Sequence, residues 1–93
     1  MKSIISNDHE CWVCGDTRDL HRHHIYGGAC RNLSETHGLW IYLCPKHHNM
    51  SNEGIHFDRR LDLFVKEHAQ RRWEERYGKT HDDFRAIFGR SYL

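Results

Sequence analysis

Cysteine and histidine, both good ligands for metal ions, are the most distinctive residues of this sequence, which contains four Cys and ten His among its 93 residues. Cys11 and Cys14 are separated by two residues, and Cys44 and His47 repeat that spacing further along the chain. Two intervening residues allow both ligand atoms of a pair to face one ion, and two such pairs complete a tetrahedral zinc site. The spacing therefore predicts a structural zinc ion (Zn²⁺) bound by Cys11, Cys14, Cys44 and His47.

Other roles for the cysteines stay open at this point. A Cys-x-x-Cys pair also occurs in redox-active proteins, and the thiols could be ordinary buried side chains. Cys30 could be the fourth zinc ligand in place of His47, although it lies beside Arg31 and away from both pairs.

Histidines outside these pairs form a second feature. His21, His23 and His24 lie within one short segment, His48 follows His47 directly, and His56 comes soon afterwards. A zinc site that joins the Cys11–Cys14 pair to the Cys44–His47 pair would also bring these histidines together. The sequence therefore indicates a second metal centre, built from imidazoles and distinct from the structural zinc.

The chain reads as one small α+β domain over residues 1–93, with a thin core that a structural metal would stabilise. We expect a loose lead-in at 1–10, a zinc-stapled core at 11–56 and C-terminal helices at 57–93. Within the core, residues 20–26 and 38–43 are predicted strands, residues 27–37 a loop, and 45–52 a short helix opened by its proline.

Two helices are expected after the core. Apolar residues recur at helical spacing over 58–77 and form one stripe, and a glycine at 78 ends the helix. A second, shorter helix is expected to begin at Thr80, which with Asp83 resembles a capping box. The apolar residues of the first stripe are Leu61, Phe64, Val65, Ala69, Trp73 and Tyr77, and those of the second are Phe84, Ile87 and Phe88.

The composition places the chain in a reducing compartment and away from membranes. It has no apolar run of about 18 residues, and its first residues are too polar for a secretory signal. We therefore expect reduced cysteines in a cytoplasm. The net charge is only +1, so any contact with nucleic acid must come from a local patch, a metal or a partner protein.

The arrangement of these motifs resembles the HNH endonuclease family, whose ββα-metal (His-Me finger) fold places a zinc-stapled hairpin before a helix. The layout resembles that of the small HNH proteins of phages and prophages. The resemblance covers residues 11–56 and rests on Cys11-x-x-Cys14, His23-His24-Ile25, Gly27-Gly28 and Leu43-Cys44-Pro45-Lys46-His47-His48.

The resemblance implies a role for several histidines. His23 and His48 match metal ligands of the family, and His24 matches the general base that takes a proton from water. The third ligand of this catalytic metal is either Asn52 or His56, and we favour His56 because imidazole binds transition metals better than a carboxamide. Neighbours on a regular strand point to opposite faces, so we expect the strand that carries His23 and His24 to become irregular near its end.

One part of the family pattern is missing. An asparagine usually precedes the second strand and holds the base histidine, but this chain has His37-Gly38-Leu39 there. Asn32, Ser34 or a backbone carbonyl could take over that role.

The resemblance implies a hydrolase, namely a metal-dependent DNA endonuclease that leaves 5′-phosphate and 3′-hydroxyl ends. Its catalytic cation would be Mg²⁺, Mn²⁺, Ni²⁺ or Zn²⁺, and Arg22 and Arg31 are the expected DNA-binding residues. If the protein is phage-encoded, it would act in a bacterial host, where a packaging or recombination assembly could deliver the DNA. The alternative is a non-catalytic zinc module for DNA or protein interaction. A different zinc hydrolase is disfavoured because no HExxH motif occurs.

Overall fold

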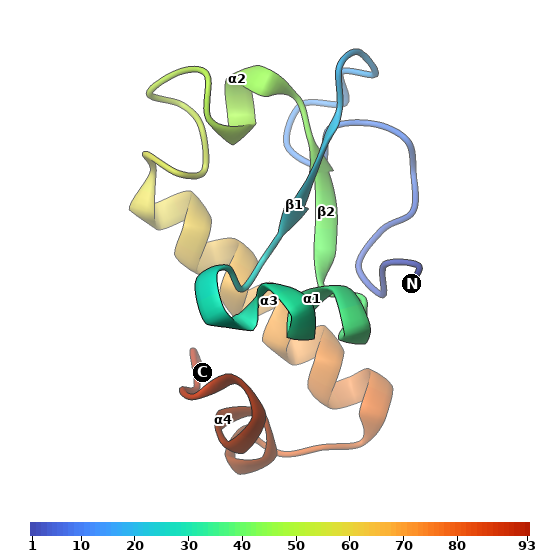
Figure 1. Ribbon diagram of the computed structural model, residues 1–93, viewed down its shortest axis with the longest axis vertical. Coiled ribbons are helices and arrows are strands. Elements are labelled where there is room, and N and C mark those ends of the chain that lie inside the picture. Colours follow the sequence, from blue (N-terminus) through green and yellow to red (C-terminus); the bar gives the residue numbers. More distant parts are fainter.

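Two short antiparallel strands form the centre of the fold (Figure 1). In the computed structural model, which describes residues 1–93, strand β1 (His21–His24) pairs with β2 (Trp40–Leu43). The register places His21 opposite Leu43 and His24 opposite Trp40. The apolar side chains of β2 are mostly buried, as the sequence predicted, and the small α+β class is confirmed.

The connection between the strands is helical, whereas the sequence predicted a loop over 27–37. A 3₁₀ turn, η1 (Gly28–Cys30), leads directly into helix α1 (Arg31–His37). Buried Ser34 stabilises this arrangement because its hydroxyl donates to the Tyr26 carbonyl and accepts from the Tyr26 amide. Gly38 ends the helix with φ 73°, a left-handed conformation that glycine adopts without strain.

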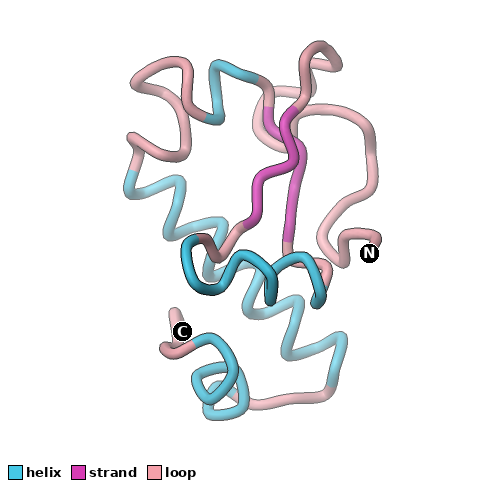
Figure 2. Tube along the Cα trace, viewed as in Figure 1, coloured by secondary structure: helices cyan, strands magenta, loops and turns pink.

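Helix α2 (Pro45–His48) follows β2 and is shorter than the predicted 45–52. A loop then leads to the long helix α3 (Arg59–Tyr77), capped at its start by the Asp58 carboxylate, which accepts from two backbone amides. Helix α4 (His81–Phe88) begins with the predicted capping box of Thr80 and Asp83. Loops make up most of the chain before β1 and between α2 and α3 (Figure 2).

The hydrophobic core lies between the hairpin and the two C-terminal helices. The buried apolar residues of α3 are Val65, Ala69 and Trp73. The core is completed by Phe84 and Phe88 of α4. The apolar faces predicted for the two helices included residues that the core does not cover, because Phe64 is 58% exposed and Ile87 is 40% exposed. No helix combines the length and the apolar character needed to cross a membrane.

Residues 1–10 are docked along the hairpin, which corrects the prediction of a loose lead-in. The buried Ser3 hydroxyl donates to the Trp40 carbonyl at 2.6 Å, and the Ile4 amide donates to the Gly38 carbonyl at 2.8 Å. The next segment follows β2, since the Trp12 amide donates to the Tyr42 carbonyl at 2.9 Å. These contacts hold Cys11 and Cys14 against β2, the strand that leads to Cys44 and His47.

Candidate metal centres and active site

The first candidate metal centre unites the two predicted pairs of ligands. One ligand atom from each of Cys11, Cys14, Cys44 and His47 lies within 4.8 Å of the others. The sulfur atoms of Cys14 and Cys44 are 3.7 Å apart, and the Cys44 sulfur lies 3.3 Å from His47 Nδ1. Tetrahedral zinc with Zn–S bonds of about 2.3 Å would separate two sulfurs by about 3.8 Å. The donor set and its dimensions fit zinc, so this Cys₃His cluster could hold the ion.

Backbone geometry explains why these four residues meet. The chain turns back after Cys14 at Gly15, whose φ is 80° and whose amide donates to the Cys11 carbonyl. On the other side, α2 starts directly after Cys44, and the His47 amide donates to the Cys44 carbonyl. Cys30 is not part of the cluster, because its thiol contacts the Phe88 carbonyl at 3.4 Å.

The second candidate centre consists of His23, His48 and His56, whose ligand atoms also lie within 4.8 Å of one another. The Nε2 atoms of His48 and His56 are 3.2 Å apart, and the His23 ring centroid lies 5.4 Å and 5.3 Å from those of His48 and His56. His56, rather than Asn52, therefore joins His23 and His48. We call these three residues the histidine cluster.

Burial and mutual repulsion favour the neutral forms of His23 and His48. Burial, followed by the nearby His48 and His56, lowers the pKa of His23 to about 3. Burial and the neighbouring His56 and His21 lower the pKa of His48 to about 4. The buried Nε2 atom of His23 has no hydrogen-bond partner, which is costly unless another group satisfies it. Three converging imidazoles, one of which has a buried nitrogen without a partner, fit a divalent transition-metal ion.

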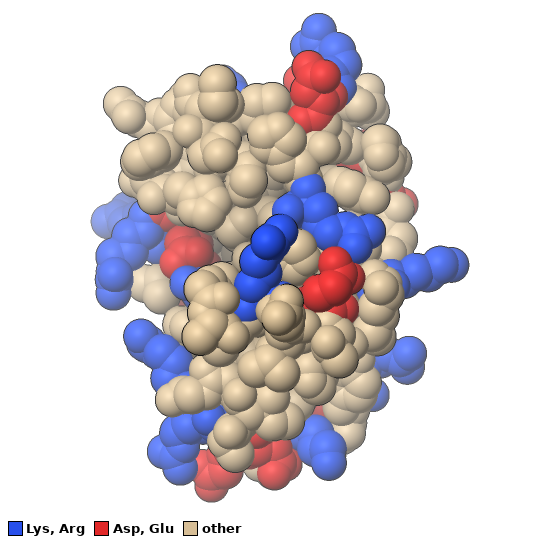
Figure 3. Space-filling view, in the orientation of Figure 1, with Lys and Arg blue, Asp and Glu red and all other residues tan.

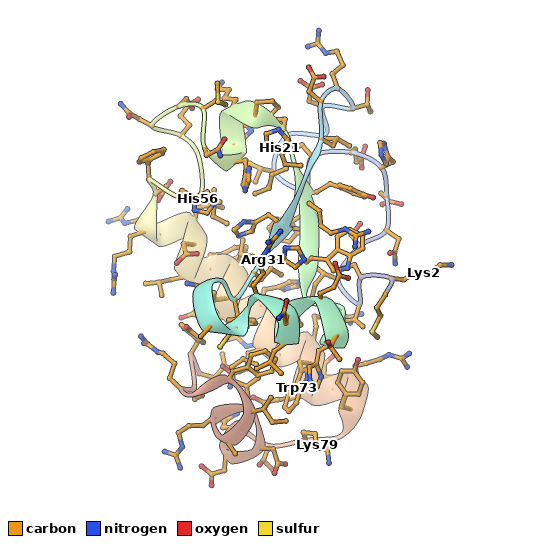
Figure 4. All side chains as sticks on the ribbon, viewed as in Figure 1. Lys2, His21, Arg31, His56, Trp73 and Lys79 are labelled. Carbon is orange, nitrogen blue, oxygen red and sulfur yellow. The ribbon has the colours of Figure 1, made fainter.

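His21 is a contact of this cluster to which the sequence analysis gave no role. Its Nδ1 lies 2.8 Å from His48 Nδ1, so the pair can share one proton and orient the His48 ring. Figure 4 labels His21 on β1 and His56 ahead of α3. The period of two along a strand, which puts His21 and His23 on one face, was the available signal.

His24 is held by a residue that the sequence analysis also missed. Its Nε2 lies 3.1 Å from the Glu35 carboxylate, and its Nδ1 accepts a hydrogen bond from Arg31 Nε at 3.4 Å. The hydrogen bonds from His24 and Arg22 lower the pKa of Glu35 to about 2. A carboxylate acceptor at one ring nitrogen and a donor at the other define a neutral tautomer with its proton on Nε2.

The candidates for holding His24 are thus corrected. Ser34 is bonded to the backbone of Tyr26 instead, and Asn32 is exposed and forms no hydrogen bond to His24. Glu35 comes from α1, the helix that the sequence analysis expected to be a loop. Because the contact spans 11 residues and depends on that helix, no local motif indicates it.

Two adjoining pockets, of about 480 Å³ and 270 Å³, border these histidines. Both are lined by His23, His24 and His56, together with Gly27 and Gly28. The strand ladder remains in register through His24, so the predicted irregularity within β1 is absent. His24 reaches the pockets because it is the last residue of the strand.

The two arginines expected to bind DNA differ in their surroundings. Arg22 is engaged within the protein, since its guanidinium bonds Glu35 at 2.8 Å and stacks 3.8 Å from the centroid of Trp40. Arg31 is exposed at the start of α1 and lines the smaller pocket (Figure 4). The geometry therefore leaves Arg31 available to a ligand and gives Arg22 a structural contact.

Comparison of the chain with protein-family models, with curated proteins and with solved structures gives no match.

Proposed function

We propose that this protein is a metal-dependent DNA endonuclease of the HNH type. The observation that carries the proposal is the convergence of His23, His48 and His56 beside His24, whose ring is held by Glu35. A purely structural metal site needs no oriented, uncoordinated imidazole next to it. A hydrolytic site needs such a group to activate water.

His23, His48 and His56 would hold the catalytic divalent cation, and the Cys₃His cluster would hold a structural zinc. When bound, the catalytic cation supplies Lewis acidity toward a phosphate oxygen and the leaving oxygen. Three protein ligands leave coordination positions open for substrate, as in other catalytic sites.

His24 would act as the general base. Its Nδ1 lone pair, which Arg31 Nε contacts at 3.4 Å, would take a proton from water once Arg31 has turned to the phosphate. Glu35 would accept the hydrogen bond from Nε2–H and stabilise the cationic ring. The water oxygen forms a bond to phosphorus, the bond from phosphorus to the 3′ oxygen breaks, and that oxygen gains a proton from solvent. The phosphodiester is thereby hydrolysed without a covalent intermediate on the protein.

A non-catalytic zinc module for DNA or protein interaction is the alternative function. The Cys₃His cluster alone would serve it, but it gives no role to the histidine cluster or to the Glu35–His24 pair. The net charge of +1 also fits a nuclease to which a larger assembly, such as a phage packaging machine, delivers DNA.

A plasmid-nicking assay tests the proposal. Purified protein should cut supercoiled plasmid in Mg²⁺, Mn²⁺ or Ni²⁺, and His24→Ala should abolish cutting while its zinc content and melting temperature stay unchanged. His81→Ala is the matched control, because His81 pairs with Glu74 on the C-terminal helices and lines neither pocket at the histidines. Retained cutting by His24→Ala would exclude the proposed mechanism.

A further inference from the structure

The two pockets that share the histidines form one groove with two basic residues in each half. The smaller pocket includes Arg31 and Arg22, and the larger one includes Arg59, at the start of α3, and Lys66. His23, His24 and His56 line both pockets and therefore lie between Arg31 and Arg59. A chain of phosphates that follows the groove would pass the histidine cluster at its middle.

The charges in the groove favour these two arginines as its free cations. Neither Arg31 nor Arg59 forms an ion pair with a carboxylate, and both are exposed. Lys66, the other basic residue of the larger pocket, is paired with Asp62 at 2.9 Å. Acidic and basic side chains alternate over the face shown in Figure 3, so phosphate attraction must be local rather than a property of a broad basic surface.

The floor of the groove is free of bulky side chains where the pockets meet. Gly27 and Gly28 line both pockets, and a Cβ added at either would meet no atom within 4 Å. A sugar–phosphate backbone can therefore approach the main chain closely beside His24. Arg31 already lies against His24 Nδ1 at 3.4 Å, within reach of an anion bound next to the base.

We propose that this groove binds the backbone of duplex DNA, with Arg31 and Arg59 contacting phosphates on opposite sides of the bond that is cut. The inference rests on the proposed function, since it assigns DNA to the same site. It replaces Arg22, whose guanidinium is held by Glu35 and Trp40, with Arg59 as the second phosphate contact.

Fluorescence anisotropy with a labelled 20-base-pair duplex tests this assignment. The full chain is used with one equivalent of zinc and no other divalent cation, over a series of NaCl concentrations, and a gel confirms that the DNA stays intact. Arg59→Ala and Arg31→Ala should each weaken binding several-fold and reduce the slope of log affinity against log salt by about 1. Arg60→Ala, the same charge change one residue along α3, should alter affinity less than about twofold.

A second variant tests the path of the groove independently of charge. Gly27→Trp places a large ring where the pockets meet, at a residue with ordinary φ of −92°, and it should weaken binding while the melting temperature is unchanged. Equal effects of Arg59→Ala and Arg60→Ala, an unaltered affinity in Gly27→Trp, or no binding by the unmodified protein would each overturn the assignment.

The two proposals fail in different ways. If Arg31→Ala and Arg59→Ala cut plasmid as fast as the unmodified protein, the assignment of the groove as the DNA-binding site is refuted, whereas the proposed nuclease activity is not. Binding with the predicted arginine dependence, but without cutting in any metal, would refute the nuclease and leave the groove as a DNA site.

Discussion

Acid should destabilise this protein through His23. Its pKa in the folded chain is about 3, whereas an imidazole in an unfolded chain titrates near 6.5. Between these two values the unfolded chain binds a proton that the folded chain excludes, so the free energy of unfolding falls as the pH falls. Each pH unit below about 6.5 costs about 1.4 kcal/mol, and His23 alone should remove about 2 kcal/mol between pH 7 and pH 5.

Urea unfolding of the unmodified protein and of His23→Gln, each with one equivalent of zinc, measures this contribution. All other titrating groups, including the zinc-binding thiolates, are common to both proteins. The difference between their losses from pH 7 to pH 5 therefore isolates His23, and the unmodified protein should lose about 2 kcal/mol more. Equal losses would show that His23 is solvated in the folded chain and would refute its burial as a neutral imidazole. Added Mn²⁺ should stabilise only the unmodified protein at pH 7, because a cation that binds the folded state raises its stability by mass action.

Three further predictions concern the groups around the two centres. Glu35→Gln should slow single-turnover plasmid nicking by about 10–100-fold, with little change in melting temperature, because an amide holds His24 less firmly; an unaltered rate would remove Glu35 from the site. Gly54→Ala should weaken Mn²⁺ binding in calorimetry, because its Cβ would lie 2.7 Å from the carbonyl oxygen of a cluster histidine. Gly27→Ala, whose Cβ meets nothing within 4 Å, is its control, and equal affinities would contradict the reasoning. Cys11→Ser should lose zinc, measured by atomic absorption, and melt about 10 °C lower or more. A variant that keeps its zinc and its melting temperature would show that the Cys₃His cluster is misassigned.

The four residues of the Cys₃His cluster could be found from the sequence because their signal is local, whereas the roles of His23, His48 and His56 came from the resemblance to a family. Paired ligands with two residues between them, as in Cys11 and Cys14, face one side of a turn whatever the rest of the chain does. The hairpin was equally accessible, since the apolar, β-branched run before Cys44 predicts a buried strand. The long helix α3 was found from its apolar period and its glycine stop.

Features set by distant contacts could not be found in this way. Helix α1 has a polar sequence after two glycines, and it is stabilised by the buried Ser34 hydroxyl and by its left-handed end at Gly38. Missing α1 meant missing Glu35, whose partner His24 is on a strand. Phe64 fits the period of α3 but is 58% exposed, and the period alone does not reveal how wide the covered face of the helix is.

The shortest α-helix of the protein links its two candidate metal centres. Helix α2 carries His47, a member of the Cys₃His cluster, directly before His48, a member of the histidine cluster. A cation bound at one cluster would hold α2 in the position that the other cluster needs, so the two binding equilibria would be cooperative. Thermodynamic reciprocity requires that each ion raise the affinity for the other by the same factor. Loss of zinc from the Cys₃His cluster should therefore lower the affinity of the histidine cluster for a cation, although none of its imidazoles has changed.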